Sequence, residues 1–203
     1  MFIEKPIKNG ITKQRRAIAG VGINDAPYIT SYKDSSGKTV FCPFYLVWKA
    51  MIVRCFDVKI LKKYPTYTGT TIDESWKTFS NFKKWMQSQK WQGKQLDKDL
   101  LSWSNKHYGP DTCLFISQAQ NSLLTLRNSK RGDYPLGVSK VNRIKQPRYI
   151  ASGTFYGKPT HLGYFKTVDE AAEAYKTAKL NYIKELAEVE QDPRIKQALL
   201  ALH

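Results

Sequence analysis

The sequence predicts an α+β fold built from two modules, and two patterns predict it. In the first half of the chain, apolar side chains recur at spacings of three and four residues, as in amphipathic helices. In the last third, three short strand-like segments precede one long helical segment. The chain has 203 residues, of which 41% are hydrophobic, so it can bury one large core or two small ones.

Residues 1–40 are rich in turn formers, and we expect an N-terminal arm or short strands there, carrying Lys13, Arg15 and Arg16. Residues 41–130 form the first module, which begins with two helices. Each helix carries an apolar stripe, which we assign to the core because burial explains the helical spacing. The stripes are Phe44, Val47, Trp48, Met51, Ile52 and Cys55, and then Trp76, Phe79, Phe82, Trp85 and Met86.

A ββα unit completes the first module. We expect strands over residues 96–100 and 113–116, joined by a loop through residues 105–110. A helix then follows over residues 117–128, and Ser117 is its expected N-cap because a serine hydroxyl can accept a free amide of the first turn.

Residues 131–203 form the second module, a three-stranded antiparallel sheet packed on one helix, with a helical extension. A basic linker at residues 127–135 leads into strands over residues 137–139, 148–155 and 161–165, with turns at Asn142-Arg143 and at residues 157–159. Thr167 and Glu170 form a capping box that opens the helix. Its inner stripe is Ala171, Ala174, Tyr175, Ala178 and Tyr182, and the alanines are small enough for close approach of the sheet.

The chain is strongly basic. It carries 33 Lys and Arg against 17 Asp and Glu, a net charge of +16, and 28 of the basic but only 10 of the acidic residues precede position 168. A polyanion is the expected partner, because neutralising a phosphate releases condensed counterions. An anionic membrane is disfavoured, since the sequence has no apolar run of roughly 20 residues, no lipidation motif and no basic amphipathic helix.

The N-terminus and the cysteines indicate the cellular compartment in which the chain is expected to fold. The first residues lack the apolar segment of a secretory signal, so we expect a reducing cytosol. Cys42, Cys55 and Cys113 have no C-x-x-C spacing, and we interpret them as buried thiols rather than zinc ligands.

Three segments of the ββα unit carry a resemblance. They are Leu96-Asp97-Lys98, Tyr108-Gly109-Pro110-Asp111-Thr112-Cys113 and Gln120-Asn121-Ser122. With Pro65-Thr66-Tyr67 and the run from Trp76 to Phe82, they make residues 40–130 resemble the HNH (His-Me finger) homing-endonuclease-like proteins of bacteriophages. The resemblance implies that Asp97 and Asn121 hold one Mg²⁺ against the scissile phosphate, and that Lys98 occupies the position of the catalytic histidine. It also implies host bacterial cytoplasm as the location.

Lys98 makes this module degenerate. A lysine with its ordinary pKa of about 10.4 is protonated at neutral pH and cannot take a proton from water. We therefore expect Lys98 to pair with Asp97, Asp99 or a phosphate. His107 could replace the histidine from the loop, although its position matches nothing in the motif and a solvated loop histidine is the simpler interpretation. Mg²⁺ is expected only if the site is catalytic, and otherwise no cofactor.

The second module resembles the APETALA (ethylene-response-factor) DNA-binding domain. The matching segments are Gly137-Val138, Tyr149-Ile150-Ala151, Leu162-Gly163-Tyr164-Phe165 and Thr167 with Glu170-Ala171-Ala172. The resemblance implies that the exposed sheet face enters the major groove. Alternation along the middle strand points Tyr149, Ala151 and Phe155 toward the helix and Arg148, Ile150, Ser152 and Thr154 outward.

Several base-reading arginines of that family are missing here, and His161 stands in the place of an outward tryptophan. We therefore expect docking on phosphates more than tight sequence readout. The candidate DNA-binding residues are Lys140, Arg143, Lys145, Arg148, Ser152, Thr154, Lys158 and His161.

Three functions are compatible with the sequence. The first is a double-stranded DNA-binding protein whose nuclease module has lost catalysis. The second is an active Mg²⁺-dependent endonuclease that nicks DNA. The third is a phage factor that binds an acidic host protein. The sequence predicts neither the cognate site nor the oligomeric state.

Overall fold

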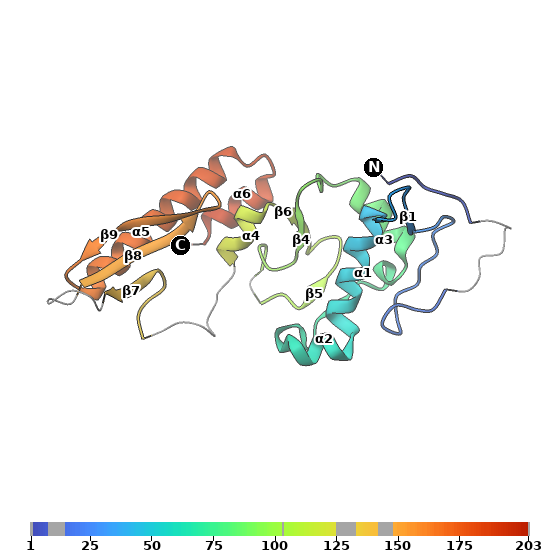
Figure 1. Ribbon diagram of the computed structural model, residues 1–203, viewed down its shortest axis with the longest axis horizontal. Helices are drawn as coiled ribbons and strands as arrows, with labels where there is room; N and C mark the ends of the chain where they lie inside the picture. The colour runs from blue at the N-terminus through green and yellow to red at the C-terminus, as the bar shows by residue number, and fades with distance from the viewer. Residues whose placement is uncertain (1, 8–14, 103, 125–132, 142–147, 203) are drawn as a thin grey trace. The chain divides into compact units, whose positions relative to one another are not determined.

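The computed structural model describes residues 2–7, 15–102, 104–124, 133–141 and 148–202 (Figure 1). Its fold is mixed α+β, as predicted, and within those ranges it has six α-helices and four small sheets. The chain divides into two compact units, Met1–Phe115 and Ile116–His203. This division falls earlier than the module boundary that we expected near residue 130, because the last helix of the ββα unit belongs to the second unit.

The first unit contains three helices, α1 (Pro43–Phe56), α2 (Val58–Lys63) and α3 (Phe79–Gln87). Its other elements are short: β1 (Ser31–Lys33), β2 (Thr39–Phe41), the 3-10 turns η1 (Pro65–Tyr67) and η2 (Glu74–Lys77), β3 (Thr71–Ile72), β4 (Gln95–Asp97), β5 (His107–Tyr108) and β6 (Leu114–Ile116), whose last residue lies past the division. None of the helices in the described part of the chain combines the length and apolar character that crossing a membrane requires.

Both predicted apolar stripes lie in the core of the first unit. Trp48, Met51, Ile52 and Cys55 are buried on α1, and Trp76, Phe79, Phe82 and Met86 are buried on the second run. The indole Nε1 of Trp48 donates to the carbonyl of Trp76 at 2.7 Å, which joins the two stripes.

The second stripe is divided between η2 and α3, although the spacing predicted one helix. Ile23 is the cause, because its amide donates to the carbonyl of Lys77 at 2.8 Å and its carbonyl accepts from the amide of Phe79 at 2.9 Å. Residues near the N-terminus are therefore packed into the unit. The guanidinium of Arg15 also donates to Asn24 Oδ1 at 2.6 Å and to the carbonyl of Tyr28 at 2.7 Å. The short strands expected in residues 1–40 are present as the antiparallel pair β1 and β2, which ends at Phe41.

The predicted order of strand, strand and helix is present. Strand β4 pairs with β6, and α4 (Gln118–Leu124) follows. Ser117 caps this helix as predicted: its Oγ accepts the amide of Gln120 at 3.2 Å, while the Gln120 side chain accepts the amide of Ser117 at 2.7 Å. One strand was not predicted. Residues His107–Tyr108, which we expected in a loop, form β5 and pair in parallel with β3.

The second unit contains the predicted three-stranded antiparallel sheet, in the order β7 (Val138–Val141), β8 (Arg148–Phe155) and β9 (Lys158–Phe165). Helix α5 (Val168–Val189) packs on one face of the sheet, opened by the Thr167 and Glu170 capping box, and α6 (Pro193–Leu200) packs against α5 (Figure 1). The second predicted turn is displaced. It lies at Tyr156-Gly157, and Lys158 and Pro159 belong to β9.

The displaced turn has a physical explanation. Tyr156 and Gly157 both have positive φ, +54° and +73°, as a two-residue turn requires when it matches the twist of its strands. A tyrosine rarely adopts this conformation. Its ring packs on that of Tyr182 with centroids 4.6 Å apart, which offsets the backbone cost.

Candidate active site and nucleic-acid interface

Asp97, the predicted metal ligand, ends β4 and turns the chain. Its Oδ1 accepts the amide of Asp99 at 3.0 Å and the amide of Leu100 at 2.7 Å. The side chain is buried, with only 9% of the residue exposed, and this burial raises the pKa of its carboxyl group. One carboxylate oxygen of Asp97 is therefore committed to local backbone amides.

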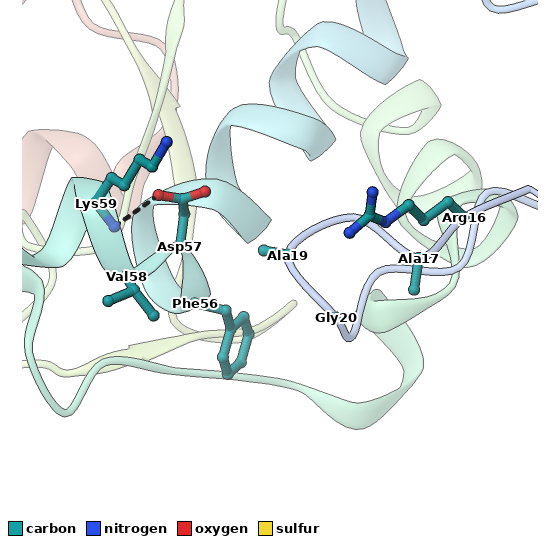
Figure 2. Close-up of a pocket in the computed structure, with 8 residues that line it drawn as sticks. All are labelled: Arg16, Ala17, Ala19, Gly20, Phe56, Asp57, Val58 and Lys59. Atoms are coloured by element: carbon teal, nitrogen blue, oxygen red, sulfur yellow. Dashed lines mark hydrogen bonds between the residues drawn. The ribbon is translucent and has the colours of Figure 1, made fainter.

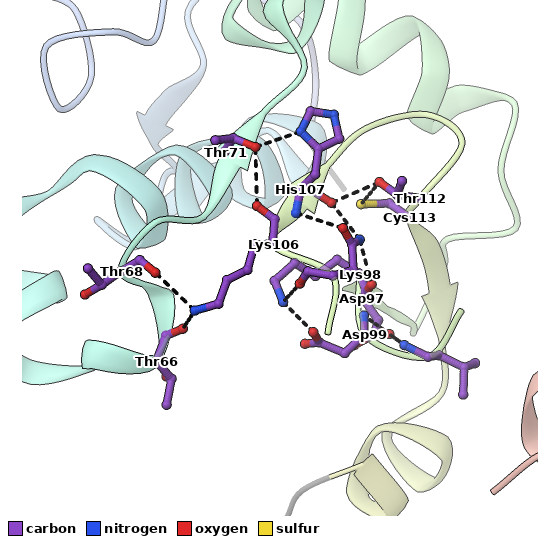
Figure 3. Close-up of polar contacts among 12 residues, drawn as sticks. Thr66, Thr68, Thr71, Asp97, Lys98, Asp99, Lys106, His107, Thr112 and Cys113 are labelled. Carbon is purple, nitrogen blue, oxygen red and sulfur yellow. Dashed lines mark hydrogen bonds and ion pairs between the residues drawn. The ribbon is translucent and has the colours of Figure 1, made fainter. Parts of the chain in front are cut away.

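Lys98, which stands where a catalytic histidine is expected, is also buried, at 7% exposure. Its ammonium forms an ion pair with the carboxylate of Asp99, one of the expected partners, and donates to the carbonyl of Asn105 at 2.9 Å. Figure 3 shows the side chain turned toward Asp99. In this arrangement the nitrogen donates to two protein groups.

Asn105 connects the loop of Lys98 to strand β5. Its Nδ2 donates to the carbonyl of Lys98 at 3.0 Å and to the carbonyl of His107 at 2.8 Å, and its Oδ1 accepts the amide of His107 at 2.9 Å. Sequence reasoning missed this residue, since an asparagine in a predicted loop carries no signal that distinguishes a turn former from a bridge between two segments.

His107, the alternative base, is tied elsewhere. Its Nδ1 lies 2.8 Å from the hydroxyl of Thr71 on β3, and Figure 3 shows its ring pointing toward Thr71 and away from the ammonium of Lys98. The expected loop position is wrong, because the residue lies in strand β5, where it is half-buried. The neighbouring Lys106 is likewise engaged, with its ammonium donating to the carbonyls of Thr66 and Thr68.

The predicted ligand pair is divided between the units. Asp97 belongs to the first unit and Asn121 to the second, where the amide of Asn121 on α4 donates to the carbonyl of the capping residue Ser117 at 2.9 Å. No group of three or more His, Cys, Asp and Glu side chains suited to a metal ion exists among the residues that the structure describes. In the first unit, Oδ1 of Asp97 already accepts the backbone amides of Asp99 and Leu100.

The predicted alternation of the middle strand is confirmed by burial. Ala151 and Phe155 are buried and Tyr149 is half-buried beneath α5, whereas Arg148, Ser152 and Thr154 are exposed. Ile150, also predicted to face outward, is half-buried. Residues that pair directly across antiparallel strands share a face, so the register defines the side opposite α5, here called the outward face. It consists of Ser139, Val141, Arg148, Ile150, Ser152, Thr154, Pro159, His161 and Tyr164.

The two described lysine candidates are placed differently from Arg148 and the polar candidates. Lys140 pairs with Tyr149 and Lys158 pairs with Phe155, so both lysines stem from the helix side of the sheet, on its two edge strands. Arg148, Ser152, Thr154 and His161 lie on the outward face. Arg143 and Lys145 lie outside the described residues.

A β-bulge shapes the outward face. The register shifts between Ala151, which pairs with Gly163, and Ser152, which pairs with His161, so Leu162 is an extra residue on β9. His161 and Tyr164 therefore both face outward although they are three residues apart, and their ring centroids are 4.8 Å apart. Gly163 allows the bulge because its φ of +143° is one that other residues rarely adopt.

A separate hollow of about 670 Å³ lies in the first unit (Figure 2). Arg16 on one wall faces Asp57 on the other, and Phe56 and Val58 add apolar surface. Asp57 also caps α2, with Oδ1 accepting the amides of Lys59 and Ile60. Because the walls carry both signs of charge, the lining does not select one class of ligand.

No protein-family model, curated protein or solved structure matches this chain. The two family resemblances therefore rest on the motifs quoted above, and the function on the chemistry of the residues.

Proposed function

We propose that this chain is a double-stranded DNA-binding protein in which the HNH-like module has a structural and binding role and no catalytic one. The observation that carries the proposal is the uneven charge of the second unit. Residues 127–166, which include the sheet, hold nine basic residues and only one acidic residue, Asp133. Residues 167–203, which include α5 and α6, hold five basic and seven acidic residues.

This distribution suits a polyanion as the partner of the segment that contains the sheet. A charge of +8 over 40 residues of sequence attracts phosphates, whereas the −2 of the helical part repels them. Residues 1–115 add 19 basic residues against nine acidic ones, which supports a second contact with the same duplex.

The surroundings of Lys98 support a role without catalysis. A general base in this position must accept a proton from water, and the ammonium of Lys98 instead donates to Asp99 and Asn105. Asp97 would have to release two backbone amides to offer Oδ1 to a metal.

The test combines plasmid nicking with a gel shift. Purified protein is incubated with supercoiled plasmid and Mg²⁺ or Mn²⁺, and binding to the same DNA is measured beside it. We expect a shift without nicking. The matched variant is Asp97→Asn, which keeps an oxygen acceptor for the backbone amides and removes the charge that a metal needs. Metal-dependent nicking that Asp97→Asn abolishes would make the chain an endonuclease instead.

Salt dependence separates DNA from a protein partner. The logarithm of the affinity should fall linearly with the logarithm of salt concentration, because each phosphate contact releases counterions. Affinity for DNA that does not respond to salt would contradict the proposal and favour an acidic protein as the partner.

A further inference from the structure

The outward face of the β7–β8–β9 sheet carries little charge. Among the residues of this face that the structure describes, Arg148 is the one cation and none carries a carboxylate. At its centre, Ile150 on β8 pairs directly with Tyr164 on β9, which is 57% exposed, and the bulge brings His161 beside Tyr164. The residues around this centre are hydroxyl-bearing or apolar. They are Ser139, Val141, Ser152, Thr154 and Pro159.

The dimensions and charge of the sheet favour the major groove of DNA. That groove is about 12 Å wide and admits a two-stranded ribbon. Strands β8 and β9 have eight residues each and lie about 4.8 Å apart, so they form such a ribbon. Lys140 on β7 and Lys158 on β9 stand on the two edge strands of the sheet, where long cationic side chains are complementary to the phosphates on either side of the groove.

Resting on the DNA-binding function proposed above, we propose that the outward face recognises the C5-methyl groups of pyrimidines in duplex DNA. Among the groups that base pairs present in the major groove, the methyl of thymine is the apolar one. Ile150 and Tyr164 can bury it. A G·C pair in the same place would press its polar edge against these side chains and leave hydrogen-bonding groups without partners. Ser152 and Thr154 can contact either base of a neighbouring pair.

The test changes only the methyl group. Binding of the full chain is measured by fluorescence anisotropy on an alternating dA–dT duplex and on the same duplex with deoxyuridine in place of thymidine. Every base pair of the first duplex carries a methyl, so the comparison does not depend on register. We expect affinity to fall about fourfold for each methyl in contact and roughly fifteenfold for two, with an unchanged salt slope.

Two variants connect the effect to this face. Tyr164→Ser should bring the ratio of the two affinities close to one. Val189→Ser is the matched control, since Val189 is 72% exposed on α5 of the same unit, and it should leave the ratio at the wild-type value. Circular dichroism confirms that both variants are folded.

Each other outcome has a defined meaning. Equal affinity for the two duplexes, with salt-dependent binding to both, would overturn methyl recognition and leave the proposed function intact. Absence of salt-dependent binding to either would overturn both. Tighter binding to duplex RNA than to either DNA would overturn methyl recognition, because RNA carries uracil and hides its major groove from side chains.

Discussion

Replacing Asn105 with alanine should destabilise the first unit strongly. The side chain makes three hydrogen bonds to the backbone of Lys98 and His107, and these groups lie in partly buried surroundings. Each such bond contributes about 0.5–1.5 kcal/mol to stability. We therefore expect Asn105→Ala to lower the free energy of unfolding by about 2–4 kcal/mol.

Tryptophan fluorescence in urea measures this loss in the first unit alone. All five tryptophans of the chain lie between residues 48 and 103, so the signal does not follow the second unit. A loss of about 3 kcal/mol should move the midpoint by about 1–2 M urea. Asn105→Asp should be no better, because it keeps the acceptor for the His107 amide but places a carboxylate opposite two carbonyl oxygens.

The control is Asn181→Ala, an exposed position of α5 in the second unit, where the same chemical change should leave the fluorescence midpoint in place. A free energy of unfolding for Asn105→Ala within about 0.5 kcal/mol of the wild-type value would refute the reasoning. A loss of that size is the lower limit for even one of the three hydrogen bonds.

Four further predictions concern the second unit and the buried thiols. Gly137→Ala should lower the free energy of unfolding by about 3 kcal/mol, because φ is +80° and the new methyl meets the ring of Tyr175. Gly157→Ala, also at positive φ but in open space, should lower it by about 1 kcal/mol, and thermal melts measure both losses. Arg148→Ala should weaken binding to all duplexes alike and reduce the salt slope by about one, and a loss on one sequence alone would contradict a phosphate contact. Burial raises the pKa of the Cys55 and Cys113 thiols to about 12, so iodoacetamide should not modify them at pH 8 in the folded protein. Stability should fall as pH rises from about 9 toward 12, because the unfolded chain loses these protons first.

Features set by local sequence were predicted well. The apolar stripes of α1 and α3, the Ser117 cap and the Thr167 capping box depend on residues three or four apart, and all are present. The three strands of the second unit were found because strand-forming residues lie between turn formers. The alternation of β8 followed from its period of two, since it lies in the middle of the sheet with both neighbours paired.

Features set by contacts distant in sequence were not predicted. Strand β5 is two residues long and exists because Thr71 pairs with His107, 36 positions away. The division of η2 from α3 depends on Ile23 in the same way. Asp97 was predicted from its type and neighbours, but its role at the end of β4 depends on the backbone of Asp99 and Leu100 turning back to it.

The positions of Lys140 and Lys158 refine the predicted interface. Both were expected beside the outward face, and both instead begin on the helix side of the two edge strands. A sheet lying in a groove presents its edges to the two phosphate backbones and its face to the bases. Long lysine side chains at the edges are therefore suited to phosphates, and an almost uncharged centre around Ile150 and Tyr164 is suited to base edges. In the proposed complex with DNA, charge would govern affinity and its salt dependence. The bulge at Gly163, which places His161 beside Tyr164, would govern which bases the face tolerates.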